Sequence, residues 1–200
     1  MNIPLVVIAL LLGYALGNFS PAYLLGRWIG GFDIREQGSG NAGATNVMRT
    51  LGWRYGVLVF TLDIIKGAAA AALGFWLAGN FGLAAAGVGV VLGHDYPAAL
   101  GFRGGKGIAA TTGVLLSLIP IPTLVGILVF VLIILGTRMV SVASLTFVSG
   151  MAVYTILTNQ PLYLIALAVI AAIFAIVRHK DNIRRVLAGV ENKISFQKKT

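Results

Sequence analysis

Three polar stretches of this 200-residue chain combine glycine, amide side chains and cations, the groups that bind phosphate and carboxylate. The first, here called the first polar loop, is QGSGNAGATNVMR, residues 37–49. Its glycines let backbone N–H groups point into a concavity, and asparagine tolerates left-handed turns. The side chains that can hydrogen-bond or pair with an anion are Ser39, Asn41, Thr45, Asn46 and Arg49. We interpret this stretch as an anion-binding site rather than a plain flexible connection.

The second stretch is GHDYPAALGFRGGKGIAATTG, residues 93–113. It contains a glycine–lysine loop made of Gly104, Gly105, Lys106 and Gly107, directly before an apolar run that predicts a helix. A helix N-terminus with free amides beside a lysine suits a phosphate group. The loop is not a Walker A motif, because Leu100 and Gly107 stand where that motif needs glycine and Ser or Thr. We therefore infer a phosphate site without nucleotide hydrolysis.

Two less patterned residues are added as candidate substrate ligands. His94, the second residue of the second stretch, could be a general base, a substrate ligand or only a helix-end residue; Asp95 beside it argues against a purely anion-binding role there. Ser144 lies inside a later apolar segment, where serine commonly bonds a backbone carbonyl instead.

The third stretch is RHKDNIRRVLAGVENK, residues 178–193. On a continuous helix, Arg178, Asn182 and Arg185 recur at spacings of three and four, as do His179 and Asn182. One face could therefore present His179 and Asn182 to a site. The alternative is that these basic residues only anchor a helix end at lipid headgroups.

The amino-acid composition indicates the class of protein that contains these three stretches. Hydrophobic residues make up 58% of the chain and charged residues 10%, with a mean hydropathy of +0.92. Soluble domains are about half apolar and a quarter charged. We predict an all-α integral membrane protein, a single transmembrane domain over residues 1–200. The seven apolar segments are 3–29, 54–78, 81–93, 107–119, 121–136, 139–158 and 161–178, of which the third and fourth are short or re-entrant.

The predicted segments are separated by helix-breaking sequences. Gly79-Asn80, Pro120-Ile121-Pro122 and Asn159-Gln160-Pro161 interrupt helical hydrogen bonding or favour turns. The first apolar run continues beyond the length of a signal peptide and lacks a cleavage site, so we expect it to remain as a helix.

The cations separate to one side of this topology. With seven spans, a single side holds Arg27, Arg35, Arg49, Arg54, Arg103, Lys106, Arg138, Arg178, Lys180, Arg184, Arg185, Lys193, Lys198 and Lys199. The positive-inside rule then predicts an external N-terminus and a cytoplasmic C-terminus, with all three polar stretches on the cytoplasmic face. The net charge of +9 is explained by this topology and by headgroup contacts of the tail, so we do not expect nucleic acid as a partner.

Asp63 and Lys66 lie inside the second predicted span, three residues apart. Ionisable residues within a membrane are costly and are either paired or functional, and a mutual pair is the economical interpretation. The chain has no cysteine and two histidines, a poor ligand set, so we expect neither a metal nor a cofactor.

Together, GSGNAGATN, GFRGGKGIA and RHKDNIRR followed by GVE resemble the three cytoplasmic motifs of the PlsY-type glycerol-3-phosphate acyltransferases. The resemblance covers essentially the whole chain. It implies transfer of a fatty acyl group from acyl phosphate to the sn-1 hydroxyl of glycerol 3-phosphate, giving lysophosphatidic acid and phosphate, the first acylation of phospholipid synthesis. It also implies functional coupling to an enzyme that makes acyl phosphate, and a place in the bacterial inner membrane.

Carried over by motif, the resemblance implies catalytic roles for Ser39, Arg49, His179 and Asn182. It implies substrate binding by Asn41, Thr45, Asn46, Gly104, Gly105, Lys106 and Gly107, with His94 and Ser144 less firmly included and Glu191 structural. The residues fit this chemistry, because acyl phosphate carries its own leaving group and needs positioning, charge neutralisation and a base. His179 and a phosphate oxygen of a bound substrate are both candidate bases.

Two competing functional classes fit the sequence less well. Neither histidine begins the His-x4-Asp pattern of CoA-dependent acyltransferases, since Ala99 and Arg184 occupy the aspartate places. A transporter of a phosphorylated or other anionic solute needs a midplane site reached from both sides, and only Asp63 and Lys66 favour it.

Overall fold

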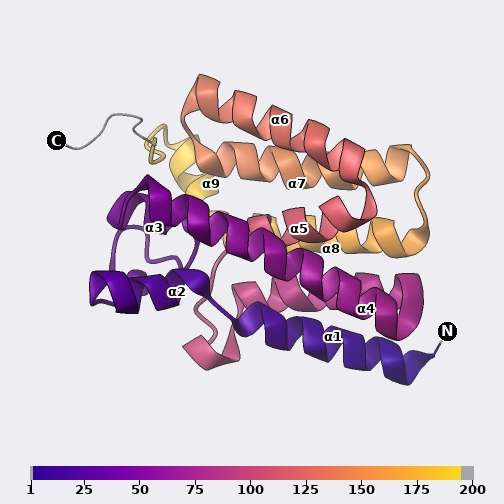
Figure 1. Ribbon diagram of the computed structural model, residues 1–200. Helices are drawn as coiled ribbons and strands as arrows, with labels where there is room; N and C mark the ends of the chain where they lie inside the picture. Colours follow the sequence, from indigo (N-terminus) through magenta and orange to yellow (C-terminus); the bar gives the residue numbers. More distant parts are fainter. Residues whose placement is uncertain (1, 195–200) are drawn as a thin grey trace.

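The computed structural model describes residues 2–194, and these residues form helices and connections without a β-strand (Figure 1). The α-helices are α1 (Ile3–Asn18), α2 (Pro21–Leu25), α3 (Ala44–Thr50), α4 (Trp53–Asp95), α5 (Ile108–Leu118), α6 (Pro120–Thr137), α7 (Val140–Leu157), α8 (Leu162–Arg178) and α9 (Lys180–Leu187). A π-helical turn, η1 (Gly26–Gly30), and two 3-10 turns, η2 (Ile34–Glu36) and η3 (Ala98–Leu100), complete the described elements. The all-α prediction is confirmed. Lys198 and Lys199, which the topology prediction counted, lie outside the described residues.

The first predicted span, residues 3–29, is not one continuous helix. It breaks after Asn18, and α2 begins again at Pro21. Pro21 has no N–H with which to continue the α1 ladder, and the Ser20 hydroxyl accepts the Tyr23 N–H as a new N-cap. The break leaves carbonyl groups at the end of α1 without helical partners. The buried ammonium of Lys66 donates hydrogen bonds to two of them, those of Gly17 and Phe19.

The predicted break between the second and third segments lies inside α4. Ala78 and Gly79 have non-helical dihedral angles, and Gly79 has a φ of 60° that favours glycine. The arm after this break returns beside α1 (Figure 1). The two approach so closely that no Cβ would fit at Gly13, Gly17 or Gly93. Small residues thus allow the backbone contact that packs helices in membranes.

The later segments also match their predicted breaks. α5 ends at Leu118 and α6 begins at Pro120, while α7 ends at Leu157 and α8 begins at Leu162. The buried core between α4, α5, α7 and α8 contains Val90, Leu115, Phe147, Val148 and Leu167. The last predicted segment ends at residue 178, as α8 does, and the chain then bends by 63° into α9, so Arg178 and Asn182 do not lie on one straight helix.

Four helical stretches are long and apolar enough to cross a bilayer, or five if α8 and α9 form one span. One of the four, Trp53–Leu100, contains the two arms of α4, and α5 is a shorter apolar helix. The predicted seven apolar segments are therefore all helical, whereas the number of crossings and their direction stay predictions. Loop 31–52 and α9 lie at one end of the bundle, and the described N-terminus and the turns near 79, 119 and 159 lie at the other (Figure 1).

Candidate active site

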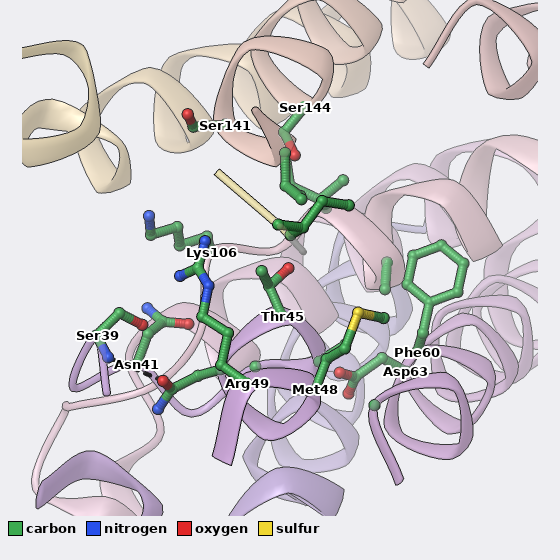
Figure 2. A pocket seen from close by; sticks show the side chains of 18 of the residues that line it. Ser39, Asn41, Thr45, Met48, Arg49, Phe60, Asp63, Lys106, Ser141 and Ser144 are labelled. Carbon is green, nitrogen blue, oxygen red and sulfur yellow. Dashed lines mark hydrogen bonds between the residues drawn. The ribbon is translucent and has the colours of Figure 1, made fainter. Parts of the chain in front are cut away.

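A cavity of about 260 Å³ lies where α3, α4, α7 and α9 meet the start of α5 (Figure 2). It brings together residues from all three polar stretches, which are up to 152 positions apart, between Ser39 and Glu191. The predicted site residues that line it are Ser39, Asn41, Thr45, Asn46, Arg49, His94, Lys106, Gly107, Ser144, His179 and Asn182. Figure 2 shows Ser39, Asn41, Arg49, Thr45 and Lys106 around one part of this cavity, with Ser144 across from them on α7.

Asn46 organises the first polar loop from within. Its side-chain amide donates to the carbonyls of Ile34 at 2.9 Å and Gln37 at 3.0 Å, and its oxygen accepts the Ser39 N–H at 2.8 Å. Its polar atoms are thus used to fold the loop, although Asn46 also lines the cavity, and its substrate-binding role stays a prediction. Ser39, Asn41 and Thr45 line the cavity beside it.

Gly104 and Gly105 are the two predicted ligands that do not line the cavity. Their amides are already bonded, Gly104 N–H to the Asp95 carbonyl at 3.3 Å and Gly105 N–H to the His94 carbonyl at 2.9 Å. Both glycines are buried, and a Cβ at either would collide with His94. The two amides are therefore used within the protein, and the predicted substrate-binding role of Gly104 and Gly105 stays a prediction. In the structure, both glycines allow the glycine–lysine loop to pack on His94 and carry Lys106 to the cavity.

Lys106 belongs to a charged network that closes one wall of the cavity. Its ammonium donates to the Asn182 side-chain oxygen, and the Asn182 amide donates to Glu191 Oε1 at 2.6 Å. Burial lowers the pKa of Lys106 to about 8, with Arg185, Arg178 and Arg49 adding to the shift and Glu191 opposing it. The lysine is therefore a partly desolvated cation held ready for an anion.

Glu191 accepts most of the hydrogen bonds in this wall of the cavity. Its carboxylate also accepts from Ser141 Oγ at 2.8 Å and Arg185 Nε at 2.9 Å. Burial raises its pKa, but the hydrogen bonds from Asn182, Ser141 and Arg185 outweigh burial and hold the pKa below its ordinary value. Glu191 therefore ties α7 to α9, and its position agrees with the structural role that we expected.

His179 occupies the bend between α8 and α9 and is buried. Its Nδ1 lies 2.7 Å from the Ala175 carbonyl oxygen. Because a carbonyl can only accept, Nδ1 carries a proton. Burial lowers the pKa of His179 to about 4, so the ring is neutral near pH 7 and Nε2 keeps its lone pair. The bend thus delivers a neutral imidazole with one accepting nitrogen to the cavity that Asn182 and Lys106 also line.

A second charged cluster lies deeper, within α4. Lys66 Nζ is 2.8 Å from Asp63 Oδ1 and 2.9 Å from His94 Nδ1, so the predicted Asp63–Lys66 pair is confirmed. Lys66 also donates to the Phe19 carbonyl at 2.9 Å, at the break after α1. Both Asp63 and His94 reach the cavity wall. His94 is thus oriented by a buried ion pair and supports the glycine–lysine loop.

Sequence reasoning missed some residues that hold the site. Asp33 and Arg35, just before the first polar loop, form an ion pair at 2.7 Å, and the hydrogen bonds from Arg35 lower the pKa of Asp33 to about 2. Arg35 also donates to the Leu100 carbonyl, which joins this segment to the loop that precedes Lys106. The acid–x–cation spacing was visible in the sequence, but its long-range acceptor was not.

Another part of the cavity wall is mainly apolar. Its lining includes Met48, Val57, Phe60, Ile108, Phe130, Ile134 and Val140. The Val57 side chain is 47% exposed on the outside of α4 while also lining the cavity. The cavity therefore runs from a polar, cationic part to an apolar part that reaches the outer surface of the helices.

Comparison with known proteins identifies what this geometry resembles. The family model described as glycerol-3-phosphate acyltransferase matches residues 7–189. A glycerol-3-phosphate acyltransferase of Thermoanaerobacter pseudethanolicus is 40% identical over 191 residues, covering 94% of this chain and 95% of the relative. That of Halalkalibacterium halodurans is 42% identical over 194 residues, covering 94% of each chain.

Two solved structures resemble the whole fold. They are crystal structures of PlsY, an integral membrane glycerol 3-phosphate acyltransferase, and both are 36% identical to this chain. The glycerol 3-phosphate form has a TM-score of 0.90 and covers 96% of this chain and 99% of its own. The lysophosphatidic acid form has a TM-score of 0.87 and covers 95% of each.

Proposed function

This chain belongs to the glycerol-3-phosphate acyltransferase family, and on that premise we propose that it transfers a fatty acyl group from acyl phosphate to the sn-1 hydroxyl of glycerol 3-phosphate. The products are lysophosphatidic acid and inorganic phosphate, in the first acylation of phospholipid synthesis. Family membership favours this activity over the transporter of an anionic solute that the buried charges left open.

The single observation that supports the proposal most directly is the two-part cavity. Arg49 and Lys106 line it together with hydroxyl and amide groups, as phosphorylated substrates require. Phe60 and Phe130 line its apolar part, and Val57 connects that part to the bilayer-facing surface. A substrate with a phosphate at one end and an acyl chain at the other fits both parts at once.

We assign the phosphate of glycerol 3-phosphate to Lys106 and Gly107, at the start of α5. Lys106 is half-buried and is repelled electrostatically by three arginines, so an incoming dianion replaces missing solvation and relieves repulsion between cations. The first polar loop then holds the acyl phosphate with Ser39, Asn41 and Thr45, and Arg49 neutralises charge on the departing phosphate.

The transfer needs no covalent enzyme intermediate. The sn-1 oxygen bonds to the acyl carbonyl carbon, the bond from that carbon to the phosphate oxygen breaks, and phosphate leaves with the electron pair. The hydroxyl proton passes to His179 Nε2 or to a phosphate oxygen of a bound substrate. Asn182 bridges Lys106 and Glu191, and so keeps the lysine beside the reacting groups.

The cellular setting follows from the same chemistry. We place the protein in the bacterial inner membrane as a multi-pass protein with the cavity on the cytoplasmic face, where the cationic loops lie by the positive-inside rule. Its acyl donor must be supplied by an enzyme that makes acyl phosphate. Its product, lysophosphatidic acid, is released into the lipid bilayer.

The test is a donor comparison with purified protein in detergent or nanodiscs. We expect phosphate release from acyl phosphate, and formation of lysophosphatidic acid, only when glycerol 3-phosphate is present. Acyl-CoA at the same concentration should give no comparable turnover. Equal rates with acyl-CoA, or no turnover with either donor, would contradict the proposal.

A further inference from the structure

Arg178, the last residue of α8, grips the backbone of the glycine–lysine loop. Its Nε donates to the Gly105 carbonyl at 2.9 Å, and its NH2 donates to the Gly104 carbonyl at 3.2 Å. The guanidinium also lies 5.0 Å from the centre of the Tyr96 ring, a cation–π contact that limits its tilt. Arg178 itself is absent from the cavity lining, so it acts on the loop rather than on a ligand.

Peptide planarity turns these two bonds into an orientation of the loop. A carbonyl and the N–H that follows it point in opposite directions within one trans peptide. The Gly104 carbonyl faces Arg178, and accordingly the Gly105 N–H points the other way, to the His94 carbonyl. In the next peptide the Gly105 carbonyl faces Arg178, so the Lys106 N–H points away from the guanidinium.

The Lys106 N–H therefore points away from Arg178, on a residue that lines the cavity. No protein acceptor takes it within residues 2–194, although Lys106 lines the cavity. A flipped peptide between Gly105 and Lys106 would turn the carbonyl, and its partial negative charge, toward the place where an anion must bind. Because glycine at 105 has no Cβ, its backbone can adopt the flipped conformation without a steric clash. A contact from elsewhere in the protein is therefore needed to hold the peptide in the observed orientation.

The same bonds join the three polar stretches. The Gly104 carbonyl accepts from Arg178 NH2 and also from the Ala42 N–H at 3.4 Å. One carbonyl thus connects the first polar loop, the glycine–lysine loop and the start of the third stretch. A group that holds this carbonyl fixes the distance between the two substrate-holding loops.

We propose that Arg178 is a positioning residue for acyl transfer, which holds the Gly104–Lys106 peptides so that the Lys106 amide and side chain both face the phosphate of glycerol 3-phosphate. The proposal deepens the function proposed above and rests on it. The fork geometry is what matters, because two carbonyls are held at once and a lysine ammonium cannot reproduce that arrangement.

The test compares Arg178→Gln and Arg178→Lys with Arg184→Gln, a matched control whose side chain on α9 is 80% exposed. Arg178→Gln should raise KM for glycerol 3-phosphate tenfold or more, with KM for acyl phosphate changed less than threefold. Arg178→Lys should restore only part of the loss. Arg184→Gln should match the parent protein. Thermal unfolding in detergent is recorded for each variant.

Tyr96 supplies an independent pair of variants that leaves Arg178 in place. Tyr96→Phe keeps the ring and should keep the parent kinetics, whereas Tyr96→Leu removes the ring and should raise KM for glycerol 3-phosphate by a smaller factor, about threefold. If Arg178→Gln does not fold, this pair and Arg178→Lys carry the test. Equal effects of Tyr96→Phe and Tyr96→Leu would overturn the proposal.

Binding without turnover separates this proposal from the proposed function. Calorimetry with inorganic phosphate, and then with glycerol 3-phosphate, needs no acyl donor. A tenfold loss of affinity in Arg178→Gln, absent in Arg184→Gln, supports the positioning role even if the donor comparison fails. Unchanged affinity, or an equal rise in KM for both substrates together with a lowered unfolding temperature, refutes it as a merely structural effect.

Discussion

Binding of glycerol 3-phosphate should weaken above pH 8, because Lys106 loses its charge there. Burial lowers the pKa of this lysine from 10.5 to about 8, and three arginines add to the shift. The phosphate of the substrate is already a dianion above pH 7, since its second pKa is about 6. Between pH 7 and 9.5 the charge on Lys106 is thus the relevant variable in this part of the cavity.

The size of the effect follows from linkage. If the substrate binds only the charged lysine, Lys106 must take up a proton on binding whenever it is neutral in the free protein. At pH 9 about one molecule in ten carries the charge, so KM should rise roughly tenfold over its value at pH 7, about 1.4 kcal/mol. Above pH 9, KM should rise about tenfold for each further pH unit. This rise should end at the pKa that Lys106 has in the complex, which the bound dianion raises.

The assay is phosphate release at saturating acyl phosphate, with glycerol 3-phosphate titrated at each pH. Lys106→Arg is the control, because arginine stays charged throughout and should give a flat profile, at whatever absolute KM its bulk allows. Lys106→Ala should give a high KM that does not change with pH. A flat profile in the parent protein, or the same slope in Lys106→Arg, would refute the reasoning.

Two further predictions concern the other buried groups. His179→Gln should lower kcat by about a hundredfold or more, as loss of a general base does; a fall below tenfold in stopped assays would instead assign the proton to a substrate phosphate oxygen. Asp63→Asn and Lys66→Met should each destabilise the protein by about 3–5 kcal/mol, because each leaves a buried charge unpaired, while the double variant should cost less than the sum. Chemical unfolding in detergent measures all three, and a strictly additive double variant would contradict the pairing argument.

Much of the fold was predictable because its determinants are local. Apolar runs specify helices, and Pro120, Pro161 and Gly79 interrupt them wherever they occur, so the seven helical segments agreed with expectation. Ser20 and Pro21 are also a local signal for a helix break, but they lie within an apolar run long enough to predict one span. Its cause was visible in the sequence, although we predicted a single helix there.

The content of the site was also largely readable, because anion binding needs few residue types. Glycine, amide and cation clusters marked Ser39, Asn41, Lys106 and Asn182, and all four line the cavity. What spacing could not reveal was which polar atoms had already been used. Asn46 bonds its own loop, and the amides of the two buried glycines bond the end of α4.

The sequence by itself thus determined the helices and the chemical character of the three polar stretches, since both depend on residue type and short spacing. Only the tertiary structure decided which groups face the cavity. The bonds of Arg178 to Gly104 and Gly105 and the contact of Lys66 with the α1 break join residues 47 to 74 positions apart, and the bend at His179 changes the direction of the helix. Such pairings arise when packed helices bring polar groups together away from water, where each must find a partner, and no local pattern encodes which partner it finds.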